Sequence, residues 1–259
     1  MTAPRIIAPL KRLQGLIAPI ALLLLWQLLS SLAIINPQML PTPWAVLSKW
    51  YEYASSGELP SDAVASLARV LGGFAIGTVL ALPLGLMMGA SQRAYSFFNP
   101  LVQIIRPIPP IAYIPLAILW FGIGNPPAYF LIAIGAFFPV LMNTIAGVRH
   151  VDSIYIRAAR NLGANRATLF RRVMLPAATP YILTGMRIGM GTAFIVVIVA
   201  EMIAVNSGLG YRILEAREYF WSDKIIAGML SIGLIGLAID SAMNALNNRL
   251  LRWHRGIEN

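Results

Sequence analysis

The chain alternates between long apolar runs and short polar intervals. The apolar runs cover about residues 17–35, 67–89, 101–124, 128–148, 181–204 and 225–246. An α-helix needs about 20 mostly apolar residues to cross the hydrocarbon core of a bilayer. The pattern therefore predicts an all-α membrane protein with six transmembrane helices, forming a single domain over residues 1–259.

The composition supports a membrane protein. Hydrophobic residues make up 58% and charged residues 12% of the chain, whereas about 25% of the residues of a soluble domain are charged. The net charge of +10 does not indicate nucleic-acid binding, because the basic residues fall between the apolar runs, where membrane orientation explains them better. The chain has no cysteine, which excludes disulfides, thiolate catalysis and cysteine-held metals.

The basic residues also predict an orientation. Six spans place both termini on the same side, together with the polar interval near residues 149–180. That side holds Arg5, Lys11, Arg12, Arg93, Arg149, Arg249, Arg252, Arg255 and five arginines of the interval. The other side has fewer basic residues, which are balanced by acidic ones. Because cytoplasmic loops carry an excess of Lys and Arg, we expect both termini and this interval to be cytoplasmic.

Two features near the N-terminus need interpretation. The first apolar run follows Lys11 and Arg12 and resembles a signal peptide in outline. It is longer than the hydrophobic region of such peptides, so we favour an uncleaved first span. The polar interval 36–66 contains several prolines and predicts an external loop with a short helix near residues 44–53.

The polar interval between the fourth and fifth runs has a structure of its own. Asp152 is a plausible N-cap, and Gly163 stands where a glycine ends a helix in the left-handed conformation. Asn165 caps a second short helix, which we expect to end at Pro176. Its arginines are Arg157, Arg160, Arg166, Arg171 and Arg172. Such a hairpin either binds another protein, which we favour, or lies on anionic lipid.

The sequence R-A-A-R-N-L-G-A-N-R-A-T-L-F-R-R-V-M-L-P resembles the E-A-A…G…LP loop of permease subunits of ABC importers. Arg157 stands where that family usually has Glu. The resemblance implies that residues 149–180 form a coupling loop, whose coupling helix docks into a groove of a cytoplasmic ATPase. The implied docking residues are Arg157, Ala158, Ala159, Arg160, Leu162, Gly163, Ala164, Phe170, Leu175 and Pro176.

The resemblance extends from about Leu67 to Trp253. R-P-I-P-P-I-A-Y-I-P-L-A-I-L-W-F-G-I-G, F-F-P-V-L-M-N-T-I-A-G-V-R and A-E-M-I-A-V-N-S-G-L-G-Y are similar to the taurine, aliphatic sulfonate, nitrate and bicarbonate permease group. This implies a type I importer-like permease fold, in a homodimer with two cytoplasmic ATPase subunits and an external solute-binding protein. It also implies a multi-pass location in the bacterial inner membrane.

The same group suggests the solute. A taurine-like or other sulfonate is the first expectation, nitrate or bicarbonate the second, and a pyrimidine vitamin precursor an alternative. ATP and Mg²⁺ are expected on the partner ATPase and no cofactor on this chain. The chain itself has no P-loop, because none of its lysines, Lys11, Lys49 and Lys224, follows a glycine.

Other function classes have less support. His150 and His254 are too few and too far apart for a metal site, and no catalytic constellation is present, so we expect no enzyme. A secondary transporter or channel would need an ion-coupling or filter site and usually repeats. Only two carboxylates, Glu201 and Asp240, lie within the spans, and no repeat is evident.

These carboxylates are the main charges to explain. An unpaired carboxylate at mid-membrane costs about 2.5–3.5 kcal/mol on insertion scales. For Asp240, Arg106 or Arg187 is a possible ion-pair partner. We favour structural pairing over contact with solute for both acids, and keep Glu201 as a candidate pathway residue.

Several uncharged residues are further candidates for the pathway. Pro109 and Pro110 remove backbone donors inside a span, which favours either a packing kink or a water-lined path. Asn143 and Thr192 are polar side chains that could line it. Met186 and Met190 either form an apolar gate or pack in the core, the commoner use of methionine.

Overall fold

The described part of the chain is helical. A computed structural model describes residues 7–32 and 34–251, except the side chains of residues 7–16, and this part contains no β-strand. The elements are α1 (Ile7–Ser31), α2 (Pro43–Ser55), α3 (Glu58–Ala90), α4 (Gln92–Ile105), the 3₁₀ turn η1 (Pro110–Tyr113), α5 (Ile114–Phe121), α6 (Asn125–Arg149), α7 (Ser153–Asn161), α8 (Arg166–Leu169), the π-helical turn η2 (Phe170–Met174), α9 (Leu175–Ala204), α10 (Leu209–Glu218) and α11 (Ser222–Leu250). The predicted all-α class is confirmed.

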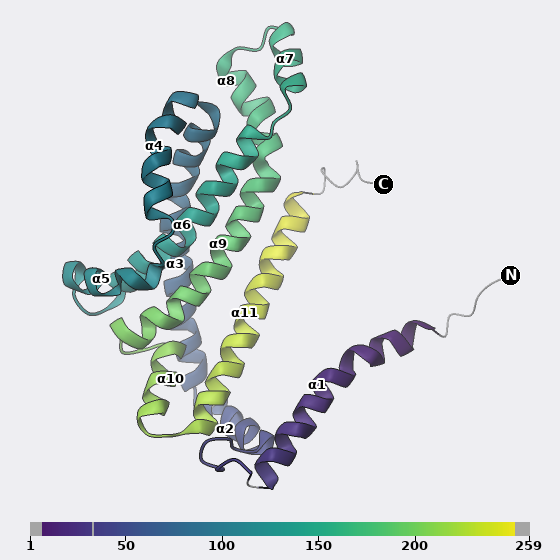
Figure 1. Cartoon of the computed structure of the whole chain (residues 1–259), viewed down its shortest axis with the longest axis vertical. Helices are drawn as coiled ribbons and strands as arrows, with labels where there is room; N and C mark the ends of the chain where they lie inside the picture. The colour runs from purple at the N-terminus through teal and green to yellow at the C-terminus, as the bar shows by residue number, and fades with distance from the viewer. Residues whose placement is uncertain (1–6, 33, 252–259) are drawn as a thin grey trace, which may run out of the picture. The chain divides into compact units, whose positions relative to one another are not determined.

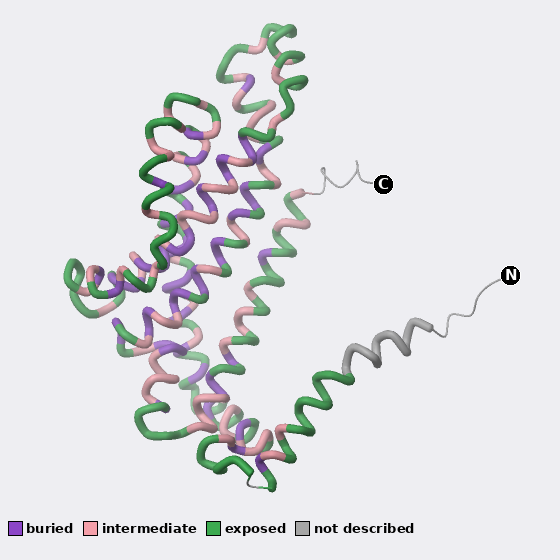
Figure 2. Tube along the Cα trace, in the orientation of Figure 1, coloured by how far each residue is buried: buried purple, intermediate pink, exposed green. Residues whose placement is uncertain are grey.

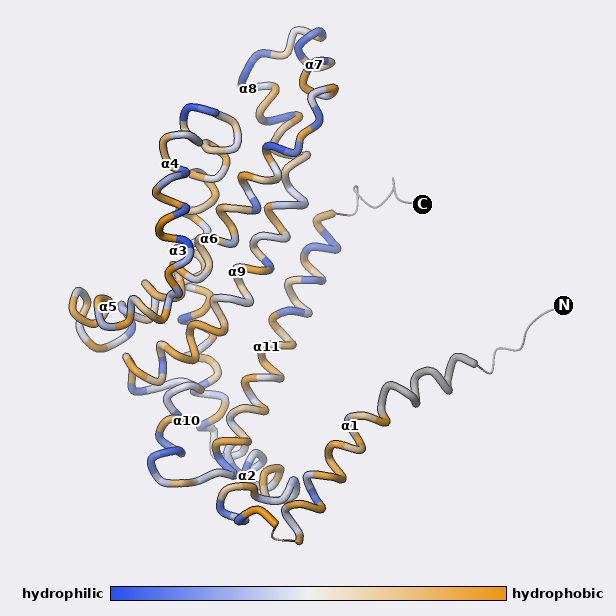
Figure 3. Tube along the Cα trace, viewed as in Figure 1, coloured by the Kyte–Doolittle hydropathy of each residue, from blue (hydrophilic) through white to orange (hydrophobic). Residues whose placement is uncertain are grey.

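Each apolar run contains helix, although the first and third runs are not helical throughout. Among the described residues, four helices are long and apolar enough to span a membrane: α3, α6, α11 and the continuous helix Arg166–Ala204. A bent pair, α4 with η1 and α5, makes a fifth candidate, and the described apolar part of α1, Ile17–Ser31, is shorter. Figure 3 shows apolar residues along these helices and hydrophilic ones around α7 and α8. Both termini, expected in the cytoplasm, lie outside the described residues.

The third expected span is broken. We expected it to begin near Leu101, but α4 begins at Gln92 and ends at Ile105. The helices on either side of the break are bent by 82°, and Figure 1 shows α5 turned aside from α4. Pro107, Pro109 and Pro110 explain the break. A proline lacks a backbone donor and disfavours the helical conformation of the residue before it.

The chain divides into two compact units. The larger consists of residues 61–211 and 232–259, and the smaller of residues 1–60 and 212–231. In the larger unit α6 and α9 lie side by side, and Figure 2 shows buried residues along both. α3 approaches α6 closely, since a Cβ on Gly77 would lie 2.5 Å from the carbonyl oxygen of Ala133. Small residues allow such close contact between membrane helices.

The smaller unit contains α2, which confirms the short helix expected near residues 44–53. Thr42 caps this helix by accepting a hydrogen bond from the backbone N–H of Ala45 at 3.2 Å. Farther along α2, Trp50 donates its indole N–H to the Ser231 hydroxyl at 2.9 Å. This bond joins α2 to the first half of α11, 181 residues later in the chain.

Candidate functional site

The hairpin of α7 and α8 is built by local turn chemistry. The Asp152 carboxylate accepts a hydrogen bond from the Ile154 N–H at 2.8 Å, and the Asn165 side chain accepts one from the Thr168 N–H at 2.8 Å. Gly163 has φ of +81°. The N–H groups of Gly163 and Ala164 bond back to Arg160 and Ala159, as in a Schellman motif. The predicted caps and glycine turn are confirmed.

The second helix of the hairpin does not end at Pro176, contrary to our expectation. It runs on through η2 into α9, so that one helix extends from Arg166 to Ala204. In the π turn the Leu175 N–H bonds to the Phe170 carbonyl, five residues earlier. Pro176 follows in the first turn of α9. The wider turn precedes the residue that has no N–H to donate, and the helix continues past it.

The hairpin has an inner apolar face and an outer exposed one. Leu169 is buried, and Ile156 and Phe170 are half-buried beside it. On the outer side Leu162 is 88% exposed, next to the glycine turn. All five arginines of the hairpin are exposed too. Among the other predicted docking residues, Ala158 and Pro176 are exposed, and Ala159, Ala164 and Leu175 are half-buried.

A hollow of about 400 Å³ lies beside the break in the third span. It brings together three of the candidate pathway residues, Pro110, Asn143 and Thr192. Arg106 lines it as well. The remaining lining residues are Ile108, Ile134, Gly135, Phe138, Pro139, Met142 and Ile188. The hollow thus lies between the proline break, α6 and α9, all in the larger unit.

The polar side chains of the hollow are partly engaged by their own helices. Asn143 donates to the Pro139 carbonyl at 2.8 Å, and the Thr192 hydroxyl donates to the Ile188 carbonyl at 3.0 Å. An amide keeps a carbonyl oxygen and a second N–H, and a hydroxyl keeps its lone pairs. Both residues can therefore still form a hydrogen bond to a molecule in the hollow.

Other candidate pathway residues lie elsewhere. Pro109 is exposed and caps η1, but does not line the hollow. Met190 is 5% exposed within the apolar core, and Met186 packs against the same core. Both methionines pack in the core in this structure, and a role as a gate stays a prediction. The Glu201 side chain has no exposed surface, so it lines no open space.

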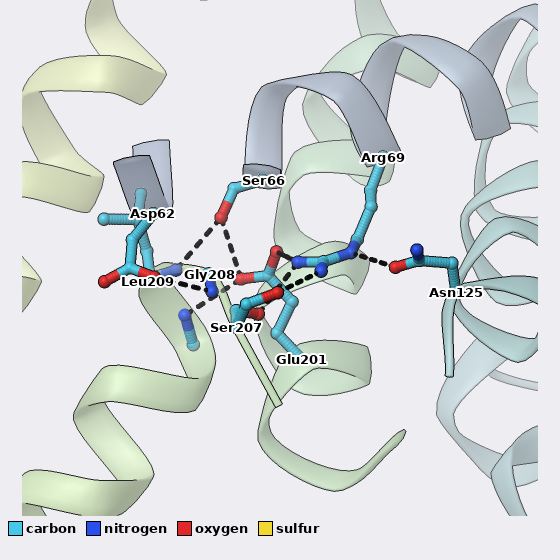
Figure 4. A network of polar contacts seen from close by, with 9 residues as sticks. Asp62, Ser66, Arg69, Asn125, Glu201, Ser207, Gly208 and Leu209 are labelled. Atoms are coloured by element: carbon cyan, nitrogen blue, oxygen red, sulfur yellow. Dashed lines mark hydrogen bonds and ion pairs between the residues drawn. The ribbon is translucent and has the colours of Figure 1, made fainter. Parts of the chain in front are cut away.

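Glu201 instead lies at the centre of a buried network (Figure 4). Its carboxylate accepts hydrogen bonds from Arg69 at 2.7 Å, Ser66 at 2.9 Å and the Gly210 N–H at 2.9 Å. Arg69 also donates to Ser207 and to Asn125. Sequence reasoning did not identify Arg69 as the partner of Glu201.

The segment between α9 and α10 is held by this network. Asp62 accepts from the Gly208 N–H at 3.0 Å, and Ser66 accepts from the Leu209 N–H at 3.0 Å. Gly208 has φ of +105°, and a Cβ on it would collide with the Glu201 carboxylate. The spacing of Asp62, Ser66 and Arg69 on one face of α3 was a signal that could have predicted this site.

The second intramembrane ion pair joins α9 to α11. Arg187 donates to both carboxylate oxygens of Asp240, each at 2.8 Å. The two side chains are 40% and 54% exposed. Of the two partners that the sequence allowed for Asp240, the structure places Arg187 there. Arg106 does not belong to this pair, because it lies at the break and lines the hollow.

Comparisons with known proteins give a consistent result. Residues 81–253 match the family described as "Binding-protein-dependent transport system inner membrane component". A probable ABC transporter permease protein of Brucella melitensis is 43% identical, with 88% of this chain and 92% of the relative covered. The taurine transport system permease protein TauC of Escherichia coli K12 is 37% identical, with 92% of this chain and 88% of the relative covered. The putative aliphatic sulfonates transport permease protein SsuC of Bacillus subtilis is 36% identical, with 95% of this chain and 89% of the relative covered.

A solved structure shows the same fold. An inward-facing form of the MetNI methionine ABC transporter aligns with a TM-score of 0.63 at 20% identity. The alignment covers 71% of this chain and 92% of the MetNI chain. The identity is low, so the likeness concerns the fold alone.

Proposed function

Because the chain belongs to the family of binding-protein-dependent transport system inner membrane components, we propose that it forms the membrane path of an ATP-driven importer for a small anionic solute. ATP and Mg²⁺ bind to two separate cytoplasmic ATPase subunits. An external binding protein delivers the solute. Both termini lie in the cytoplasm of a bacterial cell, and the whole chain acts as one permease domain.

The observation that carries this proposal is the exposed hairpin. Leu162 is 88% exposed beside a fixed glycine turn and several arginines. An exposed leucine on a rigid, charged hairpin is suited to insertion into a groove of a partner protein, as the apolar side chains of groove-bound helices are. Closure of the ATPases then moves α7, and α7 moves the continuous helix Arg166–Ala204, since the two are joined at the turn. A hairpin that lies on lipid needs no such turn.

A second copy of the chain is part of this proposal. The Arg187–Asp240 pair is about half exposed, although it lies within the membrane-spanning helices α9 and α11. Charged side chains inside a membrane normally face protein or a water-filled cavity. A second permease that packs near this face, with an aqueous path between the copies, supplies such surroundings.

The names of the relatives support a sulfonate as the solute. The relatives in Escherichia coli and Bacillus subtilis are named for taurine and aliphatic sulfonates. We therefore rank a taurine-like sulfonate first, nitrate or bicarbonate second, and a pyrimidine vitamin precursor as the alternative. A secondary transporter is less supported, because both intramembrane carboxylates are already paired with arginines.

The test is uptake by vesicles that contain the permease, its ATPase subunits and the binding protein. We expect uptake of the solute that requires ATP and all the components. A thermal-shift screen of the binding protein against small sulfonates, nitrate, bicarbonate and pyrimidines identifies that solute. Uptake by the permease alone, driven by an ion gradient, would overturn the proposal.

A further inference from the structure

The intramembrane charges of the larger unit do not balance. Three arginines interrupt its apolar segments: Arg69, Arg106 and Arg187. Arg69 is paired with Glu201 at 2.7 Å, and Arg187 with Asp240 at 2.8 Å. Within the described part of the chain, the Arg106 guanidinium makes no hydrogen bond or ion pair. One positive charge is left over, and a membrane-embedded charge normally has a counter-charge or water.

The uncompensated charge lies at the hollow. Arg106 is the first residue after α4, at the edge of the hollow of about 400 Å³. The remaining wall is mainly apolar, apart from Asn143 and Thr192. A cation with few competing groups near it interacts more strongly in such surroundings than in water.

The depth of the hollow follows from helix lengths when Gln92, at the start of α4, and Ala204, at the end of α9, are taken to lie at the membrane surfaces. α4 has 14 residues, which at about 1.5 Å per residue make about 21 Å, against a hydrocarbon thickness of about 30 Å. Arg106 at its end is therefore deeper than an interfacial arginine. Thr192 is 12 residues before the end of α9 at Ala204, which corresponds to about 18 Å along the helix.

We propose that Arg106 is the residue that recognises the anionic group of the solute, in the hollow between the proline break, Asn143 and Thr192. This inference rests on the proposed function and names the recognition site within the path. The guanidinium donates hydrogen bonds to a sulfonate, nitrate or bicarbonate oxygen, which share the same acceptor chemistry. Asn143 and Thr192 contact the rest of the solute through the hydrogen-bonding groups that their helices leave free.

The break itself gives this site its position. A continuous helix through residues 101–121 would carry Arg106 on a helical face, but the prolines end α4 at Ile105 and leave Arg106 at the bend. The proline break thus places the Arg106 guanidinium at the proposed recognition site. The two carboxylates of the spans cannot neutralise Arg106, because the other two arginines hold them.

Cysteine labelling tests the site without knowledge of the solute. The chain has no cysteine, so Thr192→Cys introduces a single thiol at the hollow. The labels are an anionic sulfonatoethyl and a cationic trimethylammonioethyl methanethiosulfonate, applied to the assembled importer in vesicles. We expect the anionic reagent to be favoured, and the anion-to-cation rate ratio to fall about tenfold when Arg106→Gln is added.

A matched control removes a different arginine. Arg187→Gln together with Asp240→Asn deletes one positive and one negative charge, and should leave the labelling ratio within about twofold of its starting value. An unchanged ratio in Arg106→Gln would overturn the inference. So would a thiol at position 192 that neither reagent reaches, since the hollow would then lie off the aqueous path.

Uptake separates this inference from the proposed function. We expect Arg106→Gln to reduce solute uptake about tenfold or more, because a hydrogen bond to a charged group is lost. Arg106→Lys should restore part of the uptake, and ATP hydrolysis stimulated by the loaded binding protein should persist in both. If the unaltered importer takes up none of these anions, the proposed function fails. If the unaltered importer takes up one of these anions and Arg106→Gln takes it up equally fast, only the inference fails.

Discussion

The Arg69 guanidinium and the Glu201 carboxylate lie 2.7 Å apart in the interior of the protein, although the residues are 132 positions apart in the chain. Their side chains are 7% and 0% exposed. The pair joins α3 to the end of α9, and the hydrogen bonds around it fasten the segment that leads into α10. A buried pair of this kind fixes a register between helices, because an unpaired charge in the interior is costly.

Removal of one partner should therefore destabilise the fold. Arg69→Met leaves the Glu201 carboxylate buried without its counter-charge and should lower the free energy of unfolding by about 3–5 kcal/mol. The double variant Arg69→Met/Glu201→Leu should be less destabilised than Arg69→Met, because no isolated charge remains. Denaturant unfolding in detergent measures both. A double variant that is worse than the single one would show that the polar network, rather than the ion pair, dominates.

Gly208 should tolerate no side chain. Gly208→Ala places a Cβ against the Glu201 carboxylate at a backbone conformation with φ of +105°, which L-residues rarely adopt. We expect faster hydrogen exchange of residues 205–211, which measures local opening. Gly57→Ala is a useful control, since Gly57 has φ of +83° but open space around it. An equal acceleration of hydrogen exchange around Gly57 and around Gly208 would assign the cost of each substitution to φ alone.

The hairpin should be required for coupling but not for folding. Leu162→Ala removes a side chain that is 88% exposed, so the permease should insert and unfold normally, while stimulated ATP hydrolysis should fall at least about tenfold. Leu22→Ala, at a leucine of α1 that is 68% exposed, is the control. Normal hydrolysis in Leu162→Ala would contradict the docking role.

A proline at the glycine turn should have the same effect through the backbone. Gly163→Pro forces φ to about −65°, whereas the turn needs φ of +81°, and it also removes the N–H that bonds to the Arg160 carbonyl. We expect normal insertion, as judged by yield in the membrane, and loss of stimulated ATP hydrolysis. Gly163→Asn should retain more activity, because Asn adopts left-handed conformations more readily.

The exposed pair of Arg187 and Asp240 should behave as a unit. Asp240→Asn leaves Arg187 as a second unpaired arginine beside Arg106, whereas Arg187→Gln/Asp240→Asn adds no unpaired charge. We therefore expect the single variant to lose more membrane yield and thermal stability than the double variant. Thermal unfolding of both in the same detergent is the measurement. Identical behaviour would indicate that water screens the pair completely.

The sequence alone determined the local features of this protein. Apolar runs of about 20 residues mark helices that cross the membrane, because the bilayer sets their length. Asp152, Gly163 and Asn165 specify the hairpin by contacts within a few residues, so their roles follow from the order of the chain. The continuation of the helix past Pro176 was missed, because a π turn has no clear sequence signature.

Only the tertiary structure decided which charges meet. Arg106 and Arg187 were equal candidates for Asp240 in the sequence, and the structure pairs Asp240 with Arg187, 53 residues away. Glu201 pairs with Arg69, which is 132 positions away in the sequence. Such contacts depend on how α3, α6, α9 and α11 pack, and helix packing follows from the fit of many side chains at once. The structure singles out Arg106 only because it shows that Arg69 and Arg187 are both paired with carboxylates.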